Sequence, residues 1–194
     1  EELPGSRGAL LRYRVMAWVV GVLLVVLVVV GMPLKYLGGN DAVVIATPNF
    51  NHIDVLCDVM AADLHVLCEK PLCTTVPDAL EVRDLARGRS AVSWMGLEYR
   101  YMPTVAAFID TVLGGAAGSL AMLSIREHRF PFLPKIDNWN RFSVNTGGTL
   151  VEKCCHFFDL MNHITGDRPV RVQASGAQDV NHLEEAYGGE VPDI

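Results

Sequence analysis

The sequence contains no pair of cysteines at the C-x-x-C spacing that zinc sites and redox motifs use. Its five cysteines are odd in number, and they stand at positions 57, 68, 73, 154 and 155. This pattern argues against a disulfide framework and against a zinc knuckle. It fits thiols that pack in the interior of a protein made in a reducing compartment.

An excess of positive charge is also missing. Lysine and arginine number 16 against 22 aspartates and glutamates, which gives a net charge of −6. The sequence pI is about 5.5. A general nucleic-acid binder would carry a basic face, so no nucleic-acid partner is expected. Hydrophobic residues make up 51% of the 194 positions, which excludes a largely disordered chain and allows one domain or two small ones.

Charge is absent altogether from the stretch VMAWVVGVLLVVLVVVGMPL, residues 15–34. A helix of about 20 apolar residues spans a bilayer, and the preceding Arg7, Arg12 and Arg14 would favour a cytoplasmic N-terminus. A cleaved signal peptide fits less well, because its apolar region is usually about 7 to 15 residues long. The same run could instead form a pair of buried strands, or come from a mispredicted first exon. The protein is therefore expected to be cytoplasmic, or membrane-anchored if residues 15–34 form a membrane helix.

Residues 41–96 alternate between apolar runs of strand length and stretches with helical periodicity. The runs 41–47, 65–69 and 90–96 predict strands, the first two buried on both faces of a parallel sheet. Thr47 with Pro48, and Thr75 with Asp78 and Pro77, are placed to begin the two intervening helices. This β-α-β-α-β order predicts an α/β fold with right-handed crossovers.

The pattern changes after Gly96. Residues 102–115 predict a helix that ends in a glycine pair, and residues 119–130 predict a half-exposed antiparallel strand. A long loop, 131–148, precedes a further helix, and residues 168–176 predict another strand.

Two turns at the carboxyl ends of the predicted strands are candidate sites. In an open parallel sheet, ligands lie beyond these strand ends, and a helix N-terminus there offers N–H groups to a phosphate or ribose. The turn ATPN, residues 46–49, has this position, and so does the tripeptide EKP, residues 69–71. Each also has a purely structural interpretation. The ATPN turn could simply be a well-capped turn, and the lysine of EKP could simply be solvated beyond the sheet edge.

The segment GGTLVEKCCHFFDL, residues 147–160, predicts an apolar helix with an ionisable stripe. Glu152, His156 and Asp159 stand at positions i, i+4 and i+7 of one helical face. Structurally, Glu152 could form a capping box with Thr149, and His156 could be a core histidine. A metal site has too few further ligands. Functionally, Glu152 could orient the ring of His156, which would then remove a proton from an alcohol as its carbon loses hydride.

Together, DAVVIATPN, HVLCEKPL and GGTLVEKCCHFFDL resemble the family of glucose–fructose oxidoreductase, inositol dehydrogenase and MocA-type proteins (Gfo/Idh/MocA), over about residues 41–180. The resemblance implies an N-terminal NAD(P)-binding Rossmann domain and a C-terminal α/β domain with a mainly antiparallel sheet. It implies hydride transfer between NAD or NADP and a sugar, inositol or related polyol, and it is compatible with a homo-oligomer.

The resemblance also implies roles for individual residues. Lys70 matches a lysine beside the nicotinamide and the reacting hydroxyl, and His156 matches the catalytic base. Glu152 matches the acid four positions earlier, which is often aspartate, and Asp159 matches a more structural position. The residues matched to cofactor contacts are Ala46, Thr47, Pro48, Asn49, Glu69, Lys70 and Pro71, with Trp139 and Arg141 in the loop that could meet cofactor or substrate.

The sequence departs from the family pattern at its front. No G-x-G-x-x-G turn precedes the ATPN strand, and Gly21 and Gly31 have the wrong spacing to cradle a pyrophosphate. We therefore expect a chain truncated at both ends, with a hydrophobic segment (1–40), the second half of a Rossmann domain (41–98) and part of a substrate or oligomerisation domain (99–194). Cofactor binding by this chain alone would then be weak. A competing hypothesis is an inactive, membrane-tethered relative or fragment that acts as a binding module.

Overall fold

The computed structural model describes residues 42–128, 130–177 and 179–193. The apolar stretch 15–34, predicted as a candidate membrane helix, lies outside these residues. Within the described part of the chain, no helix combines the length and the apolar character needed to cross a membrane.

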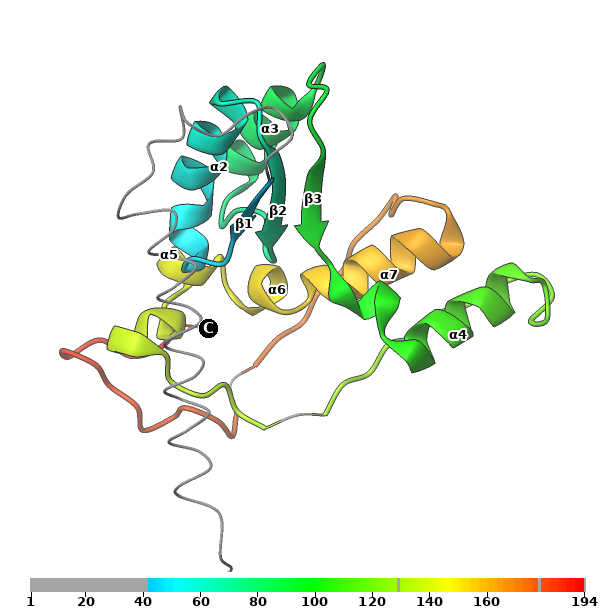
Figure 1. Ribbon diagram of the computed structural model, residues 1–194. Helices are drawn as coiled ribbons and strands as arrows, with labels where there is room; N and C mark the ends of the chain where they lie inside the picture. Colours follow the sequence, from blue (N-terminus) through cyan, green and yellow to red (C-terminus); the bar gives the residue numbers. More distant parts are fainter. Residues whose placement is uncertain (1–41, 129, 178, 194) are drawn as a thin grey trace, which may run out of the picture.

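A three-stranded parallel sheet forms the first part of the described chain. Its strands are β1 (Ala42–Ile45), β2 (His65–Glu69) and β3 (Ser93–Gly96), in the order β1-β2-β3. The 3-10 turn η2 (Asn49–Asn51) and helix α2 (His52–Ala61) connect β1 to β2, and α3 (Val76–Ala86) connects β2 to β3. The predicted β-α-β-α-β order is confirmed. All three strands run toward the same edge, so the turns that follow them meet there (Figure 1).

The core lies between the sheet and the two helices, which cover one of its faces (Figure 1). Val43 and Ile45 of β1 and Val66 of β2 point into this core. Each fully buried aliphatic side chain of this kind stabilises the fold by roughly 1.5 to 3 kcal/mol. The remaining buried members of the cluster are Leu56, Val59, Met60, Leu64, Cys68, Cys73 and Val82.

The opposite face of the sheet is apolar but exposed in the described structure. Val44, Leu67 and Trp94 are directly paired across the three strands, and they are 44%, 39% and 51% exposed. The prediction that β1 and β2 are buried on both faces is therefore wrong for the residues described, because α2 and α3 both pack on one side.

Cys68 and Cys73 are buried in the core as thiols, whereas Cys57, Cys154 and Cys155 are only half-buried. All five are free. Burial is the main cause that raises the pKa of both Cys68 and Cys73 to about 12. Protonated buried thiols are poor nucleophiles, so these two residues serve the core.

The two predicted helix starts behave differently. Thr75 caps α3 as predicted, since its Oγ1 accepts a hydrogen bond of 3.3 Å from the backbone N–H of Asp78, with Pro77 in the first turn. The predicted cap by Thr47 is wrong. Pro48 is extended, with ψ of 146°, and η2 intervenes before α2 begins at His52. Thr47 is thus too far from the free N–H groups of α2 to cap them.

The second part of the described chain is helical. It contains η3 (Glu98–Tyr101), α4 (Pro103–Leu113), η4 (Ile136–Arg141), α5 (Ser143–Thr146), α6 (Thr149–Glu152) and α7 (Cys155–Thr165). The predicted helix near 102–115 is confirmed as α4, which ends at the glycine pair. Ile109 of α4 packs against Leu160 and Ile164 of α7 in a second, smaller core.

The strands predicted for 119–130 and 168–176 do not form in the described residues. After β3, the β-pairing in the described residues is limited to an isolated antiparallel bridge between Tyr187 and Glu190. A strand requires a neighbour to pair its backbone N–H and C=O groups, and neither segment pairs with a described strand. The mainly antiparallel second sheet is accordingly not observed here.

The helix predicted for 147–160 is broken in two. α6 ends at Glu152, and α7 begins at Cys155. Lys153 and Cys154 form the break, with Lys153 at φ −113° and ψ −47°. Glu152, His156 and Asp159 therefore do not form a stripe on one helix. The break places the Lys153 side chain in contact with Tyr99 and Glu127.

Candidate active site

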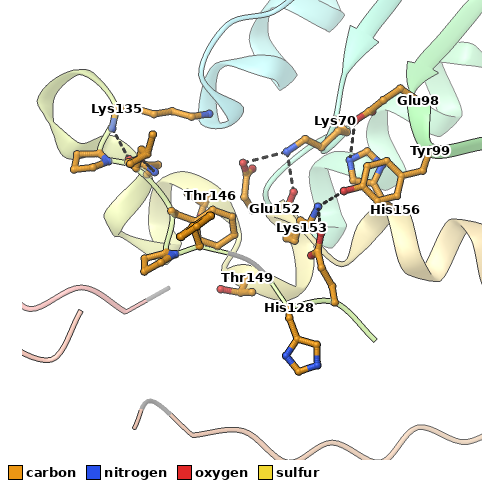
Figure 2. A pocket seen from close by; sticks show the side chains of 17 residues that line it. Lys70, Glu98, Tyr99, His128, Lys135, Thr146, Thr149, Glu152, Lys153 and His156 are labelled. Atoms are coloured by element: carbon orange, nitrogen blue, oxygen red, sulfur yellow. Dashed lines mark hydrogen bonds and ion pairs between the residues drawn. The ribbon is translucent and has the colours of Figure 1, made fainter. Parts of the chain in front are cut away.

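A pocket of about 800 Å³ opens beyond the carboxyl ends of the strands, bordered by α6, the start of α7 and residues 127–128 and 130–135 (Figure 2). This size is within the range of small-molecule sites. Lys70 and His156 both line it, although they lie in different parts of the fold. Glu98, Glu152 and Lys153 line it as well, so the pocket is rich in charge.

Glu152 joins the three sequence motifs at one carboxylate. Its Oε1 accepts a hydrogen bond of 3.1 Å from Lys70 Nζ, which also donates to the Glu152 carbonyl at 3.0 Å. Its Oε2 accepts a short hydrogen bond from Nδ2 of Asn49, which is buried in the ATPN turn. The predicted capping box with Thr149 is wrong, since Gly148 is the N-cap of α6 and no side chain caps it. Glu152 instead holds the Lys70 side chain in the lining of the pocket.

His52 connects the ATPN and EKP turns, and it was not predicted from the sequence. It is fully buried in the first turn of α2. Its Nδ1 lies 2.7 Å from the carbonyl oxygen of Pro71, and its Nε2 lies 3.0 Å from that of Thr47. A histidine three residues after Asn49 was the available signal.

His156 is 2% exposed at the start of α7. Its ring stacks on Tyr99, with centroids 4.1 Å apart and an interplanar angle of 7°. Its Nε2 lies 3.5 Å from Oε1 of Glu98, and its Nδ1 is buried with no hydrogen-bond partner in the described structure. Among these described residues, no three His, Cys, Asp or Glu side chains could hold a metal ion.

The predicted contact between Glu152 and His156 is wrong, because the helix break turns Glu152 toward Lys70. Glu98 is instead the carboxylate that faces the imidazole. Burial is the main cause that lowers the pKa of His156, opposed by Glu98 and reinforced by Lys70 and Lys153. The imidazole is therefore held in its neutral, proton-accepting form at neutral pH.

Asp159 does not line the pocket and instead forms an ion pair with Arg100. Arg100 Nε donates to Oδ2 at 2.6 Å, and its Nη2 makes a second, short contact with Oδ1. The hydrogen bond to Asp159 is the main cause that raises the pKa of Arg100. This pair fixes η3, which carries Glu98, to α7, which carries His156.

Glu98, Tyr99 and Lys153 are pocket residues that were not predicted from the sequence. Glu98 and Tyr99 begin η3, one residue after the end of β3. The rule that identified the turns after β1 and β2 applies equally to the third parallel strand, so it could have found both residues. Lys153 gave no such signal, because its position depends on the helix break.

Trp139 and Arg141 do not line the pocket. Arg141 is buried, and its Nε lies 2.8 Å from Oε2 of Glu185, so it anchors the C-terminal segment. The rings of Trp139 and Phe50 form a T-shaped pair, and Lys135 Nζ lies 4.5 Å from the Trp139 ring centroid. Of the other predicted cofactor residues, Lys70 alone lines the pocket. Glu69 is the last residue of β2, and the others belong to the adjacent turns: Ala46, Thr47, Pro48, Asn49 and Pro71.

Gly147 holds the α5–α6 connection against the EKP turn. Its φ is +81°, and a Cβ there would lie 2.7 Å from the Thr74 carbonyl oxygen and 2.8 Å from Val151. Gly147→Ala should lower the free energy of unfolding by about 2 to 5 kcal/mol, the sum of a left-handed backbone penalty and overpacking. Urea denaturation measures this change.

Gly166→Ala is the matched control for this prediction. Gly166 has a similar φ of +69°, but a Cβ there meets nothing within 4 Å. This variant should lose only the backbone contribution, about 1 to 2 kcal/mol. Equal losses in the two variants would show that the close approach to Thr74 does not matter.

Two family models cover most of the chain. The model described as "Oxidoreductase family, NAD-binding Rossmann fold" matches residues 35–97, and the model described as "Oxidoreductase family, C-terminal alpha/beta domain" matches residues 110–191. A third model, a domain of unknown function (DUF3817), matches residues 10–52.

Similar curated proteins include the rhizopine catabolism protein MocA of Rhizobium meliloti, 30% identical over 71% of this chain and 42% of the relative. Inositol 2-dehydrogenase of Pseudarthrobacter chlorophenolicus is 30% identical over 81% of this chain and 48% of the relative. The chain thus spans less than half the length of these relatives.

A solved structure of a putative myo-inositol dehydrogenase from Sinorhizobium meliloti superposes with a TM-score of 0.56 and 25% identity, covering 67% of this chain and 38% of the other. An oxidoreductase domain protein from Kribbella flavida gives a TM-score of 0.55 and 26% identity, covering 70% and 38%. Both matches agree with the α/β fold and parallel sheet described above. The chain belongs to the Gfo/Idh/MocA oxidoreductase family.

Proposed function

We propose that the chain acts in an NAD(P)-dependent oxidoreductase that transfers hydride between a nicotinamide and a hydroxyl-bearing carbon of a sugar, inositol or related polyol. The observation that carries the proposal is the meeting of Lys70 and His156 in one pocket at the carboxyl edge of a parallel sheet. Relatives named inositol 2-dehydrogenase support the substrate class.

The residues present fit the nicotinamide half of the cofactor. Thr47 Oγ1 is buried at the end of β1 without a hydrogen-bond partner in the described structure, and it is a donor that a nicotinamide amide or ribose could use. Thr47, Pro48 and Lys70 would hold this half in our proposal. When bound, the nicotinamide ring accepts or returns the hydride.

His156 accepts the substrate proton in this proposal. Its Nδ1 is fully buried, so Nε2 is the nitrogen that a substrate hydroxyl can reach. Lys70 Nζ stabilises the negative charge that develops on the substrate oxygen, and Glu152 keeps that ammonium group in place. Positioning of these groups supplies much of the rate.

The domain division is part of the same proposal. The ranges of the two family models, 35–97 and 110–191, support a boundary near residue 98. The description of the second model as a C-terminal alpha/beta domain supports a sheet in that domain, which we propose to be mainly antiparallel.

The first test is a titration of the purified chain with NADH and with NADPH, followed by nicotinamide fluorescence. The second is a hydride-transfer assay in which NAD+ or NADP+ is supplied together with inositol or glucose. We expect weak but saturable binding of one cofactor, because no G-x-G-x-x-G turn cradles its pyrophosphate, and formation of reduced cofactor with a polyol. Binding of neither cofactor at millimolar concentration, together with no turnover, would contradict the proposal for this chain.

A further inference from the structure

Lys153 is a buried cation that the proposed mechanism does not use. It lies at the break between α6 and α7 and is 8% exposed. Its Nζ lies 3.2 Å from Oε1 of Glu127 and donates a short hydrogen bond to the hydroxyl of Tyr99. Burial of a lysine is unfavourable unless its charge is paired and hydrogen-bonded. Both conditions are met here, and both partners line the pocket.

The contacts of Lys153 keep it charged. Burial by itself lowers the pKa of Lys153, but the hydrogen bonds to Tyr99 and Glu127 outweigh burial and raise the pKa above its ordinary value. The ammonium group also lies 4.6 Å from the centroid of the Tyr99 ring. Lys153 thus holds Tyr99 by its hydroxyl and by its ring face.

Tyr99 is the main contact that can set the plane of the His156 ring. A catalytic histidine is usually oriented by a hydrogen bond from its second ring nitrogen to a carboxylate or carbonyl. In the described structure, Nδ1 of His156 has no such partner, and Nε2 has only the distant Glu98. The parallel Tyr99 ring at 4.1 Å covers the imidazole face instead (Figure 2).

Charged groups on several different elements surround His156. Lys70 follows β2, Glu98 and Tyr99 lie on η3, Lys153 lies at the helix break, and Asp159 lies on α7 itself, paired with Arg100. Lys70 and Lys153 favour the neutral imidazole, and Glu98 and Asp159 favour the protonated one. Loss of the Lys153 charge therefore shifts this balance toward protonation.

We infer that Lys153 is a positioning residue for His156, acting through Tyr99. The chain Glu127–Lys153–Tyr99 holds the aromatic ring flat against the imidazole and so fixes the direction in which Nε2 faces the pocket. The catalytic meaning of this inference rests on the proposed function, but the contacts do not.

The test is an NMR titration of the full chain labelled with ¹⁵N-histidine, with the His156 signals assigned by their absence in His156→Asn. Lys153→Met should raise the pKa of His156, while Lys153→Arg, which keeps the charge, should leave it close to the wild-type value. Tyr99→Leu should broaden or split the His156 signals, because the ring loses its stacked partner. Tyr99→Phe should preserve the stack and show a smaller change.

Lys135→Met is the matched control, since Lys135 lines the same pocket but contacts Trp139 and is not among the groups that shift His156. It should leave the His156 titration unchanged. If turnover is measurable, Tyr99→Leu should lower kcat about 10- to 100-fold with little change in KM, as expected for lost orientation.

The inference is overturned if folded Lys153→Met and Tyr99→Leu proteins both titrate like the wild type. Where Lys153→Met fails to fold, a Tyr99→Leu protein that titrates with sharp, wild-type His156 signals overturns it alone. A wild-type chain without turnover, but with the expected NMR changes, would contradict the proposed function and support the positioning role.

Discussion

Replacing His156 with asparagine is expected to lower kcat for polyol oxidation about 100- to 10,000-fold, the range for loss of a general base. Asparagine keeps a polar side chain of similar reach but cannot take up the substrate proton at neutral pH. Steady-state rates of cofactor reduction, measured at saturating cofactor, give the size of the loss.

His163→Asn is the control, because His163 lies on the same helix but is exposed to solvent and outside the pocket. It should keep wild-type kcat. If His156→Asn retained kcat within about threefold of the wild type, far less than loss of a general base costs, His156 would not be the base.

The pH dependence of kcat/KM in the wild type should also reflect the titration of His156. Because burial foremost lowers the pKa of His156 below 6.5, the base is already neutral at pH 7. The value of kcat/KM should therefore fall on the acid side, with a midpoint below 6.5, and that acid limb should vanish in His156→Asn.

Stability should follow with a defined sign. On acidification, the unfolded chain takes up the proton on His156 before the folded one does. The free energy of unfolding should therefore decrease as the pH falls from 6.5 to the lowered folded pKa, and less so in His156→Asn.

Local patterns predicted the first half of the described fold well. β1, β2 and α3 follow from apolar runs and from the Thr75 cap, and these signals act over a few residues. Exposure of the second sheet face was not predictable in this way. The sequence 41–69 is equally apolar whether one face of its strands is covered or both.

Tertiary contacts explain the errors in the second half. Residues 149–160 have helical periodicity throughout, yet the helix is interrupted at Lys153, whose side chain contacts Tyr99 and Glu127. These partners are distant in sequence and no spacing rule connects them. The motifs located Lys70 and His156, but the partner of each had to be seen in three dimensions.

Lys70→Met is expected to affect both turnover and stability, and the two effects can be separated. Removal of a donor that stabilises developing charge should lower kcat about 100- to 1,000-fold. The Glu152 carboxylate, 14% exposed, would also lose its cation and keep only the hydrogen bond from Asn49. Loss of one partner from a buried pair costs about 3 to 5 kcal/mol, and partial solvation should reduce this to about 2 kcal/mol.

The double variant Lys70→Met/Glu152→Gln separates the two roles of Lys70. The introduced amide would carry no charge and could still accept from Asn49, so the free energy of unfolding should recover by about 1 kcal/mol or more relative to Lys70→Met. Turnover should stay low, because the ammonium group beside the substrate is still missing. Urea denaturation and steady-state rates on the wild type, both single variants and the double variant complete the cycle. Recovery of kcat together with stability would show that Lys70 only neutralises Glu152, and hydride transfer would then need a different electrostatic partner for the substrate oxygen.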